Sequence, residues 1–151
     1  MKRSLSLKLF ALLFSAVLIS ACATPSQVYW DHKVKELCEK DGGVTVYEKV
    51  ELTKDEFDKL DIPFERNAKS NSPYYRVSLD DVVINDSPKV WKGGQEIIRK
   101  SDGKVLGVQV SYGRRGGDVT TGVSEPSHYE CNQIDGINLS LTKSVFLIKG
   151  E

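Results

Sequence analysis

The feature that most constrains this chain is an apolar run near its start, because it decides which residues take part in folding. Lys2, Arg3 and Lys8 form a positively charged beginning, and residues 9–19 follow as an apolar stretch in which Ser15 is the one polar residue. A stretch of about a dozen residues is typical of a signal-peptide core. A membrane-spanning helix needs about 20 residues, a length reached here only by including the charged Lys8. The run therefore predicts a removed signal segment rather than a membrane span.

The end of this run places an aliphatic residue and two small residues directly before a cysteine, in Leu18-Ile19-Ser20-Ala21-Cys22. This segment resembles the lipobox of bacterial lipoproteins. The resemblance implies that the Cys22 thiol receives a diacylglyceryl group, that cleavage occurs just before Cys22, and that the new amino terminus is acylated. Two or three acyl chains anchor a protein stably to a membrane, whereas one binds marginally. The alternative is a buried cysteine in an apolar helix, but no amphipathic pattern or helix cap accompanies the run.

The lipobox divides the chain into three parts: residues 1–21 as a removed lipoprotein signal peptide, 22–27 as a tether, and 28–151 as a single globular envelope domain. A mature chain of about 130 residues suits one domain with a true core. The resemblance implies a lipid-anchored protein of the cell envelope that faces the periplasm. Ala23 lacks the aspartate that marks inner-membrane retention in enteric bacteria, which favours the outer membrane over the inner membrane.

The charge balance argues against nucleic acid as a partner. Removal of residues 1–21 takes away Lys2, Arg3 and Lys8 and no acidic residue, which leaves 18 basic and 21 acidic side chains. An acidic protein gains nothing from releasing the counterions of a phosphate backbone. We therefore expect membrane lipid, through Cys22, and another envelope protein as partners, and no nucleic acid.

Assigning Cys22 to lipid leaves Cys38 and Cys131 as an even pair in an exported chain. Oxidising compartments favour a disulfide between two such cysteines. The bond closes a loop of about 94 residues, for which chain entropy predicts a stabilisation on the order of 4 kcal/mol. His128 lies near Cys131, but a structural zinc site normally needs four ligands. We therefore predict a disulfide, no metal and no cofactor other than the covalent lipid on Cys22.

Hydrophobic periodicity predicts an α+β domain, with an N-terminal helix packed on an antiparallel sheet of four to five strands. Trp30, Val34, Leu37 and Cys38 share one face of a helix, and an Asp-Gly pair between apolar runs is a strong hairpin signal. Thr53 and Glu56 form a capping-box pattern. The expected helices are 27–40 and 53–60, and the expected strands are 44–52, 74–84, 95–99, 105–112 and 144–149.

The most distinctive segment of the predicted domain is Ser111-Tyr112-Gly113-Arg114-Arg115-Gly116-Gly117-Asp118. Arginine forks match the geometry of phosphate and carboxylate groups, and flanking glycines permit a tight backbone. Arg114, Arg115, Gly116 and Gly117 are therefore candidate anion-binding residues. The segment matches neither the phosphate-loop spacing nor the dinucleotide fingerprint, so a solvated loop that leaves a strand is the favoured interpretation.

Candidate catalytic groups are weak, and we predict no enzyme. Residues 122–126 lack the second glycine of a nucleophile elbow, and a cysteine nucleophile requires a reduced thiol. Exposed aromatic residues anchor protein interfaces, which makes Tyr29, Trp30 and Trp91 candidate contact residues. Tyr74 and Tyr75 are neighbours on a strand and must point to opposite faces, so we expect one of them to be exposed.

A further resemblance is carried by residues 37–43, 46–50, Ser111-Tyr112 and 115–118, ahead of Cys131. Through these residues the expected mature chain resembles small lipoproteins of Gram-negative bacteria. This likeness supports Cys38 and Cys131 as a matched pair, but it brings no catalytic or binding residue. The predicted function is a non-enzymatic, membrane-anchored lipoprotein that binds or supports another envelope component. The alternative is a small anion binder that uses Arg114 and Arg115, and a hydrolase is third.

Overall fold

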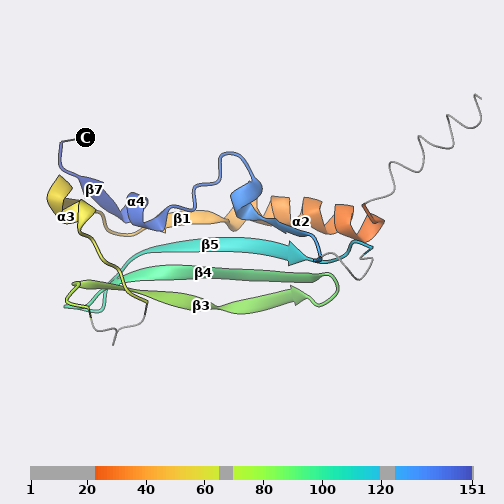
Figure 1. Cartoon of the computed structure of the whole chain (residues 1–151), viewed down its shortest axis with the longest axis horizontal. Coiled ribbons are helices and arrows are strands. Elements are labelled where there is room, and N and C mark those ends of the chain that lie inside the picture. Colours follow the sequence, from red (N-terminus) through yellow and green to blue (C-terminus); the bar gives the residue numbers. More distant parts are fainter. Residues whose placement is uncertain (1–22, 65–69, 120–124, 151) are drawn as a thin grey trace, which may run out of the picture.

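The computed structural model describes residues 23–64, 70–119 and 125–150. The predicted signal peptide and Cys22 lie outside these residues. The described chain is an α+β domain in which an N-terminal helix packs on an antiparallel sheet of five strands (Figure 1), as the sequence predicted. No helix within these ranges has both the length and the apolar character needed to cross a membrane.

The central strand of the main sheet is β5 (Val105–Arg115). One of its edges pairs with β4 (Lys89–Arg99), which in turn pairs with β3 (Tyr74–Asn85). Its other edge is shared by two short strands, β1 (Gly43–Val46) and β6 (His128–Glu130), placed one after the other along β5. All of these pairings are antiparallel.

Helix α2 (Pro25–Asp41) starts earlier than the predicted 27–40. The Thr24 hydroxyl caps it by accepting from Gln27 N at 3.0 Å, and proline suits the first helical turn because its missing N–H has no partner there. The helix ends at Gly42, where a Cβ atom would lie 2.6 Å from the Cys38 carbonyl oxygen. The predicted tether over 22–27 is therefore too long, since its last three residues are helical.

The predicted strand over 44–52 is wrong as one element, because the chain bends after β1. The amides of Tyr47 and Glu48 both donate to the Leu106 carbonyl, at 2.9 and 3.0 Å, which is a local irregularity that ends regular pairing. The chain then enters β2 (Val50–Leu52), which belongs to a separate two-stranded sheet. The capping box of Thr53 and Glu56 is confirmed at the start of α3 (Lys54–Asp58).

The C-terminal region also differs from the prediction of one strand over 144–149. Helix α4 (Leu141–Val145) precedes strand β7 (Phe146–Ile148), and β7 pairs with β2 in parallel. The short 3₁₀ helix η1 (Cys131–Gln133) follows β6 directly. The predicted hairpin between β4 and β5 is confirmed, and Gly103 in its turn has a φ of +70°.

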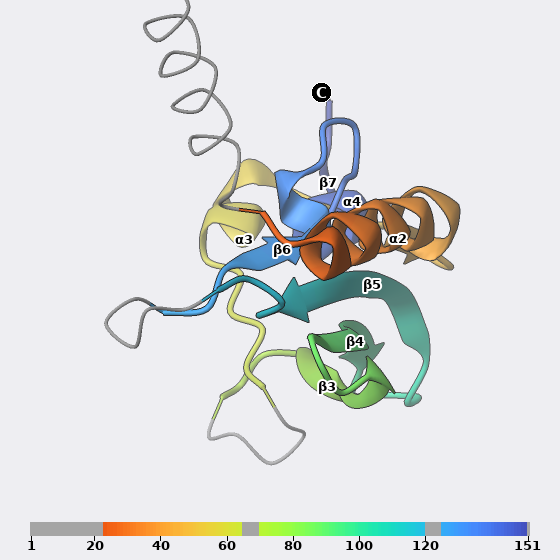
Figure 2. The same ribbon diagram turned by 90° about the vertical axis from the view of Figure 1, so that its right-hand side faces the viewer.

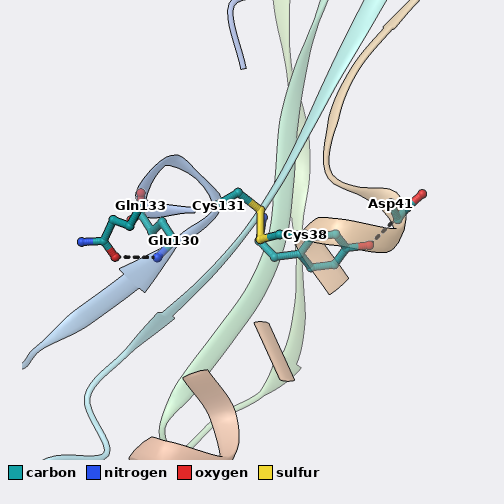
Figure 3. The surroundings of a disulfide bond; sticks show 6 residues. Cys38, Asp41, Glu130, Cys131 and Gln133 are labelled. Carbon is teal, nitrogen blue, oxygen red and sulfur yellow. Dashed lines mark hydrogen bonds between the residues drawn. A yellow bond between two sulfur atoms is a disulfide. The ribbon is translucent and has the colours of Figure 1, made fainter. Parts of the chain in front are cut away.

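Two apolar clusters form the core. The first, under α4 and β7, contains Ile62, Tyr74, Ile97, Leu106, Leu141, Val145 and Phe146. The second lies under α2 and contains Val34, Cys38, Val90, Tyr112 and Cys131. The predicted disulfide is confirmed: Cys38 and Cys131 are bonded across this second cluster, with their Cα atoms 5.4 Å apart (Figure 3). Figure 2 shows that β3 and β4 lie on the far side of β5 from α2.

Candidate functional site

The predicted anion-binding arginines have separate environments. Arg114 is 1% exposed, and its Nε lies 2.5 Å from Oδ1 of Asp31 on α2. Its Nη1 donates to the Gly116 carbonyl and to the Ser127 hydroxyl, the latter at 3.1 Å. Arg115 is exposed and lies 3.9 Å from the Glu125 carboxylate. The guanidinium of Arg114 is thus held inside the protein, and the two arginines do not converge on one solvent-facing site.

The glycines after these arginines also have structural roles. Gly116 and Gly117 adopt φ values of +84° and +91°, which only glycine adopts freely. The Gly117 carbonyl accepts from the Thr24 hydroxyl. Asp118 accepts from the Ser127 amide at 3.1 Å, and this hydrogen bond lowers the pKa of the Asp118 carboxyl. Through the bond to Thr24, the loop that follows β5 is held against the start of α2.

The cysteine pair offers no accessible nucleophile in this structure. Cys38 and Cys131 are fully buried, and the Tyr112 amide donates to the Cys131 sulfur at 3.1 Å. Figure 3 shows the bond between α2 and the turn after β6, where the Glu130 amide donates to the Gln133 side chain. Within the ranges that the structure describes, no three His, Cys, Asp or Glu side chains are grouped to hold a metal ion.

One group of ionisable side chains joins α2 to the sheet. The Asp41 carboxylate accepts from Lys92 Nζ at 2.7 Å and from the Tyr112 hydroxyl at 2.5 Å. These bonds, that of Lys92 first, lower the pKa of Asp41. Burial and the bond to Asp41 raise the pKa of Tyr112, so the phenol stays protonated. The group is an ion-paired link rather than a general base.

The most exposed part of the sheet is the open edge, which we define as residues 77–84 of β3. Four apolar side chains in this segment face solvent, and Val82 is 59% exposed. Strand β3 ends the sheet order, with β4 on its inner side. Its outer side carries one isolated bridge, between Phe64 and Arg76, with the Arg76 amide donating to Pro63 at 2.8 Å. Past Arg76, none of the described strands pairs with the open edge. The exposed apolar residues are Val77, Val82, Val83 and Ile84.

The open edge is interrupted by a bulge at its centre. The register with β4 shifts between Leu79 and Val82, so Asp80 and Asp81 interrupt the regular pairing. Bulges and inward or edge charges are devices that keep exposed strands from aggregating. The bulge and the two aspartates therefore protect the edge against indiscriminate pairing.

A polar groove of about 290 Å³ lies beside the open edge. Along β5, Tyr112 and Arg114 contact α2, so the alternating residues Ser111 and Gly113 point away from that helix. The indole of Trp91 covers Gly113, where a Cβ atom would lie 2.4 Å from the ring. The lining includes Ser78, Asp81, Trp91, Gly93, Gln109 and Ser111.

The aromatic residues that the sequence singled out are distributed unevenly. Tyr74 and Tyr75 are 9% and 7% exposed, so the prediction that one of them is exposed is wrong. Tyr74 packs edge-on against Phe146, with ring centroids 4.8 Å apart. Tyr29 is exposed, whereas Trp91 is partly buried and forms a wall of the polar groove.

Sequence reasoning identified Trp91 but missed the groove and the open edge. The groove gathers residues from four strands, β3, β4, β5 and β6, and its glycines carry no chemical signal in the sequence. The apolar run Val82-Val83-Ile84 is visible in the sequence, but its exposure, which marks it as a candidate contact surface, is visible only in the structure.

Comparison with known proteins identified no relative. The chain matches no protein-family model, no curated protein and no solved structure.

Proposed function

We propose that this protein is a non-enzymatic envelope lipoprotein, anchored through lipid on Cys22 and facing the periplasm, with the outer membrane as its location. In this proposal it binds another envelope protein by accepting an extended segment of that protein along the open edge. The observation that carries the proposal is the exposed outer side of β3 over residues 77–84, with which no strand in the described part of the chain pairs.

Strand addition suits this edge because an unpaired strand offers a row of N–H and C=O groups. Arg76 donates its amide outward, to Pro63. Since the direction of backbone groups alternates along an antiparallel strand, the amide of Ser78 also points outward. Exposed apolar side chains further along, such as Val82 and Val83, add area that an incoming strand covers.

The charges at the centre of the edge favour a foreign strand over a second copy of this chain. Two open edges related by a twofold axis pair antiparallel, so the middle of one strand faces the middle of the other. Asp80 and Asp81 occupy that middle, and like charges placed opposite each other destabilise a strand pair. A partner segment with basic or neutral residues at this point avoids that repulsion.

The proposed anchor fixes the orientation of the edge. Only Ala23 separates Cys22 from the helix cap at Thr24, a distance of at most about 7 Å. Gly117 packs between Pro88, at the tip of the β3–β4 hairpin, and Gln27, at the start of α2. An anchored domain thus holds the hairpin tip near the bilayer, and the open edge runs from there into the periplasm.

The proposal is tested in cells by photo-cross-linking. A photoreactive residue at Val82, on the open edge, is expected to give one discrete product with another envelope protein. The same residue at Val28, which is equally exposed on α2, serves as the control and is expected to give none. In parallel, Cys22→Ala is expected to abolish palmitate labelling and to release the protein from membranes.

Blocking the edge makes the test specific to strand addition. Ser78→Pro removes an amide that points away from β4, a position where an edge strand tolerates proline, and it is expected to abolish the Val82 product. Ser78→Ala keeps the amide and is expected to leave the product unchanged. Identical products at Val82 and Val28, a product that survives Ser78→Pro, or a dimer of this chain would each contradict the proposal.

A further inference from the structure

We infer that the polar groove beside the open edge is a binding site for a neutral oligosaccharide. The inference rests on the groove alone and does not depend on strand addition. Its basis is the combination of an aromatic wall, a glycine of β4 over which a carboxylate lies, and several fixed hydrogen-bonding groups.

The aromatic wall is the indole of Trp91. The ring lies over Gly113, with three of its carbon atoms within 2.8 Å of the position that a Cβ atom would occupy. Glycine at that position lets the indole settle onto the backbone of β5, and any larger residue displaces it. Aromatic rings provide rigid contact area with little entropy to lose on binding, and the apolar C–H face of a sugar ring fits such a surface.

The floor of the groove depends on a second glycine. A Cβ atom on Gly93 would lie 2.4 Å from Oδ1 of Asp81, so the absence of a side chain lets this carboxylate reach across from the bulge of β3. The bulge therefore has a second consequence besides protecting the edge, since it places a hydrogen-bond acceptor over the groove.

The amides of the groove are held in place by a chain of side-chain hydrogen bonds. Gln95 donates to Gln109 Oε1 at 2.9 Å, and its own oxygen accepts from Arg76 at 3.3 Å. Arg76 is fixed in turn by donating to the Thr142 hydroxyl on α4 at 2.8 Å. Side chains held in this way lose little further freedom when a ligand binds. The hydroxyl of Ser111 adds a group that both donates and accepts.

The charges of the groove select a neutral ligand over an acidic one. Asp81 and Glu130 both line it, and a like charge brought next to a carboxylate is repelled. Hydroxyl groups donate to carboxylates and accept from amides, so a neutral sugar satisfies both kinds of group. The volume of about 290 Å³ lies near the lower end of the range for small-ligand pockets, which suits one or two sugar rings.

The test uses the full-length protein in a detergent without a sugar headgroup. The chain has two tryptophans, so Trp30→Phe leaves Trp91 as the source of indole fluorescence. Titration with tetraacetylchitotetraose and with maltotetraose is expected to give a saturable fluorescence change with at least one of them. Tetragalacturonate, an acidic tetrasaccharide, is expected to bind at least about tenfold more weakly.

Two variants fill the groove and retain Trp91. Gly93→Val, made in the Trp30→Phe background, pushes a side chain into the floor and is expected to weaken binding by at least about tenfold. Ser111→Leu does the same from β5 and serves if Gly93→Val fails to fold. Val82→Thr, on β3 but outside the groove lining, is the matched control. It is expected to bind the neutral oligosaccharide like its parent.

The inference is overturned if neither neutral oligosaccharide gives a saturable change, if tetragalacturonate binds as well as they do, or if a folded groove-filling variant binds like its parent. Because these readouts do not involve the outer side of β3, a failure here is separate from a failure of strand addition. Conversely, cross-linking at Val82 is expected to be unaffected by Ser111→Leu.

Discussion

The two edges of the main sheet differ in how far they are covered by the rest of the domain. Along one side of β5, the short strands β1 and β6 lie next to a buried disulfide, whose cysteines precede β1 and follow β6, and α2 packs against this half of the domain. On the other side, β3 runs for 12 residues, and most of its second half is exposed to solvent. The first edge is covered, whereas no described strand pairs with residues 77–84 of the second, where a bulge and two aspartates interrupt the strand.

This difference suggests a division of roles, in which the covered edge stabilises the domain and the open edge serves the proposed binding. Short strands held by a helix and a cross-link give no template for a foreign strand. A long exposed strand gives such a template, and natural proteins keep one only where they can protect or use it. The polar groove reaches from β3 across the sheet to Glu130 of β6, on the face where Ser111 points away from α2, so both proposed binding surfaces lie away from α2.

The largest expected effect comes from releasing the closed edge. The double substitution Cys38→Ala/Cys131→Ala is expected to lower the free energy of unfolding by about 4 kcal/mol, because a long loop is no longer constrained in the unfolded chain. Urea unfolding measures the loss. Hydrogen exchange is expected to rise more at β1 and β6 than at the β3–β4 pairing.

The control for this experiment is the unmodified protein with its disulfide reduced, which is expected to show a similar loss. A double variant as stable as the parent would mean that packing of α2 alone closes this edge. Faster exchange at β3 than at β6 in the variant would reverse the comparison between the two edges.

A smaller effect is expected from the buried arginine at the end of β5. Arg114→Met breaks the ion pair with Asp31 and is expected to lower the free energy of unfolding by about 2 kcal/mol. Loss of one partner of a buried pair costs about 3–5 kcal/mol, and here the 30% exposure of the Asp31 side chain reduces that cost. Arg115→Met, at the exposed neighbour, is expected to change stability by less than about 0.5 kcal/mol. Thermal and urea unfolding distinguish the two, and equal effects would contradict the assigned roles.

The sequence was sufficient to predict features that follow from a periodic pattern, from a residue count or from a local turn signal. The helical period of Trp30, Val34 and Cys38 predicted α2, and the parity of the cysteines predicted the disulfide. The Asp-Gly turn predicted the β4–β5 hairpin, and all three predictions are confirmed. Each of these signals lies within one short segment or follows from composition.

Features that depend on distant contacts were beyond such reasoning. Arg114 is buried because Asp31, 83 positions earlier, reaches it, and an Arg-Arg-Gly-Gly sequence alone gives no sign of that partner. The strand predicted over 44–52 keeps its alternation in sequence, whereas the chain turns because two amides share the Leu106 carbonyl. The groove arises from register, since Trp91 meets Gly113 only when β4 and β5 pair as they do.

The smallest expected effect concerns the link between α2 and β4. Because folding lowers the pKa of Asp41, its bond to Lys92 contributes stability above the ordinary Asp pKa of about 4, and this contribution is lost as the pH falls through the lowered value. Both side chains are more than a third exposed, so Asp41→Asn is expected to cost less than about 1 kcal/mol at neutral pH.

Thermal unfolding of the parent and of Asp41→Asn across the acid range tests this link. The two are expected to differ at neutral pH and to converge as the pH falls below about 4. Asp86→Asn, at the exposed tip of the β3–β4 hairpin, is the control and is expected to match the parent at neutral pH. If the parent and Asp41→Asn still differ in stability in acid, the hydrogen bond from the Tyr112 hydroxyl dominates the link. That hydroxyl still needs an acceptor after Asp41 is protonated. That result would make the α2–β4 contact a neutral hydrogen bond rather than an ion pair.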